Sequence, residues 1–294
     1  MKTSKTVLVL VALIAVLALV AAGTGVLWQG NGHPYPFTTL RGETVMMHGR
    51  GLYRYETVSG AAQAIASDVV TLGLGIPLLW ISAWLYGRGS LRGHLLLAGT
   101  LGYFLYTYAS MAFLAAFNPL FLAYVALFSL SLFAFILAMT SIDVAALPSR
   151  FSDRLPRRGI AIVLFAIGGF LLLAWLGRIV PALLTGAPPY GLESYTTLVI
   201  QALDLGLIVP LAILAGLLLL KARPLGYLLA AVALLKGLTM ATAVSAMAVG
   251  QVLAGLTVSP VELVVFPGLA LANAAMAWML LRNVQPSATR AHQP

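Results

Sequence analysis

The chain has no cysteine among its 294 residues. Disulfide bonds, thiolate nucleophiles and thiolate-bound metals are therefore excluded. The zinc motif His-Glu-x-x-His, the nucleophile elbow Gly-x-Ser-x-Gly and the phosphate-binding P-loop are missing as well. The four histidines are scattered along the chain, which argues against a histidine metal site or a pair of haem ligands. These absences weigh against an enzyme, and we expect neither a metal nor a cofactor.

Charge is also scarce. Charged residues make up 9% of the sequence, whereas a soluble domain has roughly 25%. Hydrophobic residues make up 61%, and the mean hydropathy is +0.99. Apolar runs of about 20 residues predict membrane-spanning helices, and eight such runs are present: 6–28, 66–86, 92–115, 119–141, 159–182, 195–220, 225–249 and 259–281. The sequence therefore predicts an all-α polytopic protein whose main partner is the lipid bilayer.

The basic residues predict how the chain is oriented in the membrane. With eight spans, every second connection is basic, and one side receives Lys2, Lys5, Arg88, Arg92, Arg150, Arg154, Arg157, Arg158, Lys221, Arg223, Arg282 and Arg290. The other side receives only Arg41, Arg50 and Arg54. Because Lys and Arg concentrate on the cytoplasmic side, we predict a plasma (cytoplasmic) membrane protein with both termini in the cytoplasm. The net charge of +9 thus reflects topology and not nucleic-acid binding.

The first apolar run also resembles a signal peptide, because basic residues precede it and small residues lie near its end. It continues to Trp28, which is longer than the apolar region of most signal peptides. We therefore favour a helix that is retained. Cleavage would leave seven spans in the same orientation.

An internal repeat organises the predicted spans. The segment 70–98 aligns without gaps with 203–231, and the matches include Gly73 with Gly206, Pro77 with Pro210 and Gly93 with Gly226. We predict two parallel four-helix halves, 1–141 and 159–282, joined by a basic cytoplasmic linker at 142–158 and followed by a cytoplasmic tail at 283–294. Parallel repeats occur in transporters, with the substrate site between the repeats. The alternative is chance similarity between two leucine-rich hairpins.

The connection 29–65 is the one extramembrane piece large enough to fold. Its β-prone runs, Glu43 to Met47 and Leu52 to Val58, predict a hairpin around a Gly-rich turn. We expect a small extracellular cap over the bundle. It either covers helix ends or contributes Arg50 and Arg54 to an outer mouth that binds an anion.

Two charges lie inside apolar runs, Asp204 and Lys236. A charge at bilayer depth costs several kcal/mol unless it is paired or hydrated, so it marks a candidate functional site. At ~1.5 Å per residue, Asp204 is ~15 Å from the outer end of its run and Lys236 is ~16 Å from the inner end of the next. These depths sum to about the ~30 Å of hydrocarbon. We therefore predict a salt bridge between them near the membrane midplane.

Other polar residues extend this candidate site. Helical spacing groups Asp204 and Lys236 with Gln201, Thr239, Glu262 and Asn273, and the outer mouth would receive Arg178, Glu193 and Asp68. Under the repeat, the counterparts of Asp204 and Lys236 are Thr71 and Tyr103. Tyr103 begins a polar aromatic face that continues through Tyr106, Thr107 and Ser110. Such residues either line a path or join helices by hydrogen bonds.

These patterns favour a solute carrier or ion-coupled permease whose ligand is a small solute or a proton. One alternative is a sensor, assembly factor or scaffold in which the ion pair fixes helix register. A second alternative is a membrane-embedded lipid-modifying enzyme, which would need a lipid-accessible cleft reaching a carboxylate.

Overall fold

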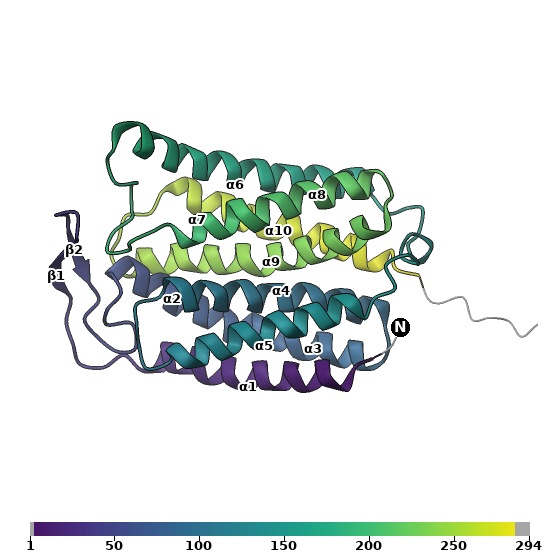
Figure 1. The fold of residues 1–294 in the computed structure, drawn as a ribbon, viewed down its shortest axis with the longest axis horizontal. Helices are drawn as coiled ribbons and strands as arrows, with labels where there is room; N and C mark the ends of the chain where they lie inside the picture. Colours follow the sequence, from purple (N-terminus) through teal and green to yellow (C-terminus); the bar gives the residue numbers. More distant parts are fainter. Residues whose placement is uncertain (1–2, 286–294) are drawn as a thin grey trace, which may run out of the picture.

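The computed structural model describes residues 3–285 and consists of packed helices with one small hairpin (Figure 1). Eight helices in this range are long and apolar enough to cross a membrane, which agrees with the predicted number of spans and is compatible with a multi-pass membrane protein. They are α1 Lys5–Leu27, α2 Val58–Val70 continued by η1 Thr71–Gly75 and α3 Ile76–Gly87, α4 Leu91–Leu114, α5 Phe121–Thr140, α6 Arg157–Thr185, α7 Val199–Leu203 continued by η3 Asp204–Ile208 and α8 Val209–Leu220, α9 Pro224–Leu253 and α10 Pro260–Arg282.

The second span begins at Val58, about two helical turns before the predicted start at 66. Thr57 caps it, because its hydroxyl accepts a hydrogen bond from the Gly60 amide at 3.0 Å. This contact satisfies one of the free amides at a helix N-terminus. The first turns of α2 are less apolar than a spanning segment usually is, so the hydropathy of the sequence does not reveal them.

Two π-helical turns interrupt the spans, η1 in the second and η3 in the sixth. Each is followed within two residues by a proline, Pro77 and Pro210. A proline lacks an amide hydrogen and its ring clashes with the carbonyl four residues earlier, which belongs to Gly73 or Gly206. A wider turn relieves this conflict locally. The first residues of the two turns, Thr71 and Asp204, are equivalent in the repeat alignment.

Two glycines allow successive spans to meet at tight turns. A Cβ on Gly93 would collide with the backbone of Leu85 and Tyr86, and a Cβ on Gly226 would collide with the backbone of Leu218 and Leu219. The first residues of α4 and α9 therefore pack directly on the end of the preceding helix.

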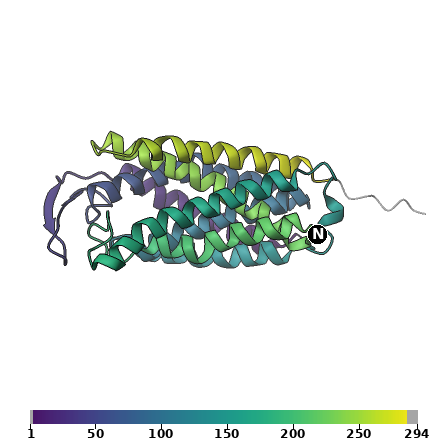
Figure 2. The ribbon, with the colours of Figure 1, turned by 90° about the horizontal axis from the view of Figure 1, so that it is seen from above.

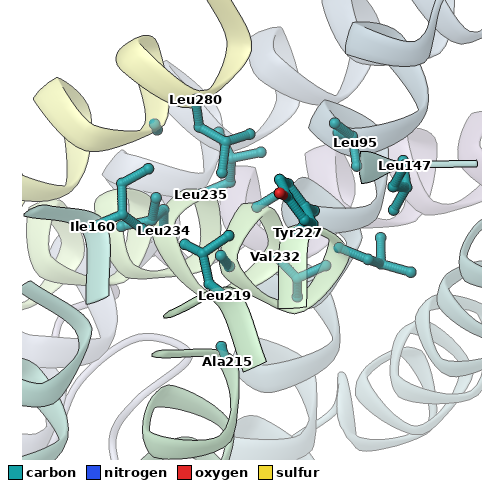
Figure 3. Packing of buried hydrophobic residues seen from close by; sticks show 14 of the residues in the cluster. Leu95, Leu147, Ile160, Ala215, Leu219, Tyr227, Val232, Leu234, Leu235 and Leu280 are labelled. Carbon is teal, nitrogen blue, oxygen red and sulfur yellow. The ribbon is translucent and has the colours of Figure 1, made fainter. Parts of the chain in front are cut away.

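Figure 1 shows α1 to α5 in the lower part of the bundle and α6 to α10 in the upper part, with α4 and α9 beside each other. One cluster of buried side chains fills the end of the bundle that carries the linker, which includes the short helix η2 Pro148–Arg150. Figure 3 shows Leu95, Leu147, Leu219, Tyr227 and Val232 converging there. We call this whole cluster of buried side chains the linker-end cluster. A second cluster joins α1, α3, α4 and α5.

The hairpin differs from the prediction. Strand β1, Tyr35–Thr38, pairs antiparallel with β2, Thr44–Met47, so that Tyr35 lies opposite Met47. The predicted pairing with Leu52–Val58 is limited to a bridge from Met47 to Thr57 and to hydrogen bonds from the His48 and Gly49 amides to the Glu56 and Arg54 carbonyls. Gly42 closes the tighter loop with a φ of 84°, and the left-handed Gly49 and Gly51 coil the chain away. These conformations suit glycine because it lacks a Cβ.

The hairpin lies at the end of the bundle opposite the start of α1 (Figures 1 and 2). The side of the membrane that it faces and the boundaries of the two halves stay predictions. Most of the predicted tail 283–294 lies outside the described residues, as do Lys2 and Arg290.

We expect Gly226→Ala and Gly93→Ala to lower the thermal unfolding midpoint in nanodiscs, because overpacking a close contact costs about 1–3 kcal/mol. Gly169→Ala in α6 is the control, since its added Cβ meets no atom within 4 Å. An unchanged midpoint for Gly226→Ala would contradict the close backbone approach.

Candidate functional site

A cavity of about 410 Å³ lies between helices α2 and α4 on one side and helices of the segment from α6 to α10 on the other. This volume falls within the range of roughly 300–1,000 Å³ that is usual for small-molecule sites. Residues from α2, α4, α6, α7, α9 and α10 line it, and so does the α6–α7 loop. The cavity reaches both intramembrane charges predicted from the sequence, Asp204 and Lys236.

Asp204 is held by two neutral donors from other helices. The Tyr106 hydroxyl of α4 donates to Oδ1 at 2.6 Å, and the Trp175 indole of α6 donates to Oδ2 at 2.9 Å. The side chain is 7% exposed. Each carboxyl oxygen therefore has one hydrogen-bond donor, which offsets part of the cost of leaving water.

Lys236 lies against the same tyrosine. Its Nζ is 3.8 Å from the centroid of the Tyr106 ring, and the residue is 7% exposed. The predicted salt bridge is absent, because no Lys236 nitrogen lies within 4 Å of an Asp204 oxygen. Tyr106 instead contacts both groups, the carboxyl through its hydroxyl and the ammonium through its ring.

The Cα atoms of Asp204 and Lys236 also lie at different levels along their helices. Asp204 opens η3 and the span ends with α8 at Leu220, whereas Lys236 belongs to α9, which begins at Pro224. At ~1.5 Å per residue, the Cα of Asp204 is about 24 Å from the shared turn and the Cα of Lys236 is about 18 Å from it. The estimate from the sequence put them at one level because it began the sixth span at residue 195 and not at Val199.

Of the other predicted midplane residues, some line the cavity and the rest do not. Gln201 and Asn273 line the cavity, and both are buried. Thr239 does not, because its hydroxyl donates to backbone carbonyls of its own helix. Tyr103 is buried beside Thr71, with 2.8 Å between the two hydroxyl oxygens. Glu262 is exposed near the start of α10 and is not part of the cavity lining.

The predicted outer mouth is also only partly assembled. Arg178 and Glu193 line the cavity. Asp68 does not, because it is buried against Gly25 of α1 and accepts a hydrogen bond from the Tyr53 hydroxyl at 2.5 Å. Arg50 and Arg54 are exposed in the loop before α2 and do not reach the cavity. The Arg54 guanidinium stacks on Tyr55 instead, 5.3 Å from the ring centroid.

The mouth contains residues that the sequence analysis did not identify. Glu56 accepts hydrogen bonds from the Ala116 amide at 2.6 Å and from the Tyr195 hydroxyl at 2.8 Å. The Thr57 hydroxyl donates to the Glu193 carboxylate. In the same region, the Arg41 guanidinium donates to the Tyr195 carbonyl at 2.6 Å and to the Glu193 carbonyl at 3.2 Å. We call Arg41, Glu56, Thr57, Glu193 and Tyr195 the outer polar contacts.

The sequence gives few signals for the residues that hydrogen-bond at the mouth or that donate to Asp204. Glu56 is one of only eight acidic residues, which is a weak signal. Tyr106 belongs to the predicted aromatic face of the third span. Trp175 carries no periodic signal, because tryptophan in a span usually marks an interface. Their roles depend on contacts between helices that are distant in sequence.

Burial also changes acidity at the mouth. It raises the pKa of Glu56 above the ordinary 4.5, although the hydrogen bonds from Ala116 and Tyr195 act in the opposite direction. Burial likewise raises the pKa of Tyr195. In the hairpin loop, burial and the nearby Arg50 lower the pKa of His48.

The pKa of Glu56 predicts how stability depends on pH. Above pH 4.5 the unfolded chain loses a proton that folded Glu56 retains up to its raised pKa, so the free energy of unfolding falls as pH rises through this window. We expect Glu56→Gln to remove this part of the slope of melting temperature against pH. The exposed Glu43→Gln is the control and keeps the wild-type slope. A wild-type slope in Glu56→Gln would contradict the assignment.

The two donors to Asp204 predict a coupled loss of stability. Tyr106→Phe and Trp175→Phe each remove one hydrogen bond to a carboxyl group, which is worth about 1.5–3 kcal/mol when that group is charged. We expect both losses to shrink in an Asp204→Asn background, as measured by double-mutant cycles of unfolding. The exposed Trp278→Phe serves as the tryptophan control. Equal losses in both backgrounds would show that the donors act elsewhere.

Comparison with known proteins gives no match: no family model, curated protein or solved structure is similar to this chain.

Proposed function

We propose that this integral membrane protein is a solute carrier or ion-coupled permease whose site is the cavity that contains Asp204 and Lys236. The observation that carries the proposal is an ammonium group at bilayer depth that borders a cavity and has no acceptor among residues 3–285. Ionisable groups in spans usually face a bundle interior or a hydrated cavity and mark a substrate or ion pathway.

The proposal includes the two parallel repeats. Three local features recur under the repeat alignment: the π-helical turn, the proline that follows it and the glycine that contacts the preceding helix. The equivalent pairs differ, because Thr71 and Tyr103 are hydrogen-bonded to each other. Their counterparts Asp204 and Lys236 are connected through Tyr106 instead. The shared π-helical irregularity of the backbone supports a repeat over chance similarity between leucine-rich segments.

The position of the cavity fits this organisation. Its lining combines α2 and α4, which belong to the first proposed half, with α6, α7, α9 and α10 from the second. Transporters built from repeats carry their substrate sites at such a boundary, near the midplane. The basic residues support an orientation with the linker in the cytoplasm and the hairpin outside.

The two ends of the cavity suggest how access could alternate. Toward the hairpin, it is bordered by Glu56, Glu193 and Tyr195, which belong to the outer polar contacts. Toward the linker, the apolar linker-end cluster fills the bundle (Figure 3). Val232 of that cluster lies one helical turn before Lys236 on α9. Opening at this end would require α9 to separate from its neighbours.

Tyr106 connects the two charges in this proposal. Its hydroxyl donates to Asp204 while its ring contacts Lys236. A ligand that binds the ammonium and shifts this ring would weaken the hydrogen bond to the carboxyl group. Binding and proton occupancy at Asp204 would then be linked, as ion coupling requires.

The second candidate is a scaffold, sensor or assembly factor. It is favoured by the satisfaction of Asp204, whose donors come from α4 and α6 and therefore fix the register of three helices. In such a protein the linker-end cluster would stay closed.

Cysteine accessibility distinguishes these candidates, because the native chain has no cysteine. We expect a membrane-impermeant maleimide to label Ser110→Cys, in the cavity, from the hairpin side. In vesicles of the opposite orientation we expect it to label Val232→Cys, whose native side chain is 3% exposed here. Labelling of Val232→Cys reports the alternative open state.

Two controls calibrate the rates. Leu40→Cys is 91% exposed and should react fully from the hairpin side, whereas Leu173→Cys on α6 is 72% exposed on the apolar surface and should stay unlabelled in the bilayer. Permanent protection of Val232→Cys, with Ser110→Cys accessible, would reject the carrier and leave the scaffold.

A further inference from the structure

We infer that the cavity selects a small organic anion with an apolar body, bound through Lys236 and Arg178. This inference rests on the proposed function, because it names the class of solute that the carrier would bind. It follows from an imbalance between the charged groups that line the cavity: the carboxylates are already hydrogen-bonded, and the cations are not.

The carboxylates that line the cavity are Asp204, Glu56 and Glu193. Each accepts a hydrogen bond from a neutral donor of the protein: Asp204 from Tyr106 and Trp175, Glu56 from Ala116 and Tyr195, and Glu193 from Thr57. Their donors come from separate elements and hold the carboxyl groups in fixed orientations. A cationic ligand would have to compete with these contacts.

The cations that line the cavity are Lys236 and Arg178. Among residues 3–285, no oxygen accepts a hydrogen bond from either side chain, and no carboxylate lies within 4 Å of their nitrogens. The Arg178 Nε is itself buried without a partner. Lys236 has the Tyr106 ring beside it and Arg178 is half-buried, but neither cation regains by hydrogen bonds to the described part of the protein what it loses in contact with water. An anionic ligand would supply the missing acceptors.

The sum of formal charges does not favour anions, because three carboxylates and two cations line the cavity. Hydrogen-bonding capacity favours an anion instead, because the charged donors in the lining have no hydrogen-bond partner among the described residues, whereas each carboxyl group already has at least one. Charge-assisted hydrogen bonds to a carboxylate or similar group are roughly twice as strong as neutral ones.

The two cations lie at successive depths. Arg178 is three residues after Trp175 on α6, which is about 4.5 Å farther toward the hairpin at ~1.5 Å per residue. Trp175 marks the level of Asp204, because it donates to that carboxyl group. Arg178 is thus the first cation that a solute entering from the hairpin end would meet, and Lys236 is the second.

Apolar side chains form much of the remaining wall, including Leu171 on α6, Met240 and Val244 on α9, and Phe266 on α10. They suit the body of a ligand and offer it no hydrogen bonds. A compact inorganic anion would leave these walls without contacts, whereas an organic anion would bury its apolar part against them.

Charged thiol reagents test this selectivity even though the solute is unidentified. We would compare 2-sulfonatoethyl methanethiosulfonate, which is anionic, with its cationic 2-(trimethylammonio)ethyl counterpart at Ser110→Cys in the full chain in neutral-lipid nanodiscs. Rates would be divided by those at the exposed Leu40→Cys. We expect the normalised anionic rate to exceed the cationic rate at least tenfold, and Lys236→Met or Arg178→Gln to reduce this ratio.

A second arm tests the apolar body with benzoate, benzamide and benzamidine, which share one shape and differ in charge. We expect benzoate to slow modification of Ser110→Cys by the neutral methyl methanethiosulfonate more than the other two, and inorganic phosphate to have no effect. Protection by phosphate equal to that by benzoate would overturn the requirement for an apolar body.

The outcomes separate the two proposals. Equal rates for both charged reagents, or a cationic preference, would overturn anion selectivity while leaving an accessible cavity and the carrier in place. No reaction of Ser110→Cys with any reagent would overturn both. An unchanged ratio in Lys236→Met and Arg178→Gln, with normal melting temperatures, would overturn the assignment of selectivity to these two cations.

Discussion

The contact between Tyr106 and the two intramembrane charges is the interaction on which the candidate site depends. An ionised group in hydrocarbon is stable only with hydrogen bonds, a counter-charge or water. Tyr106 provides a donor for Asp204 and an aromatic face for Lys236, so neither needs the other directly. The ammonium thereby keeps its hydrogen-bonding capacity. A direct salt bridge would have consumed it.

Backbone irregularity puts the carboxyl group where Tyr106 can reach it. Asp204 opens the π-helical turn that Pro210 induces six residues later. The equivalent turn at Thr71 is followed by Pro77 and directs a hydroxyl toward Tyr103. The same kind of π-helical turn therefore presents a carboxyl group in one span and a hydroxyl group in the other. Asp204 contributes its charge to the cavity, whereas Thr71 forms a neutral hydrogen bond with Tyr103.

The cavity and the linker-end cluster divide the interior of the bundle into a polar part and an apolar part. Hydrogen-bonded groups at the hairpin end can exchange partners at modest cost in free energy, because water or a solute can form the same hydrogen bonds. The apolar contacts of Val232 and Leu219 can be replaced only by contacts with lipid or with other side chains. A carrier would thus change conformation at the linker end, whereas a scaffold would use the same cluster to stay rigid.

The sequence by itself determined the membrane class, the eight spans and the two charged residues at depth, because hydropathy and charge are summed along one segment. It also located the prolines and glycines whose local effects recur in both aligned segments. Only the tertiary structure decided that Trp175 and Glu56 belong to the site, that Asp68 and Glu262 do not, and that the ion pair is interrupted. Those outcomes depend on helix register and on contacts between distant segments, and a one-residue difference in register turns a side chain by about 100° around a helix with 3.6 residues per turn.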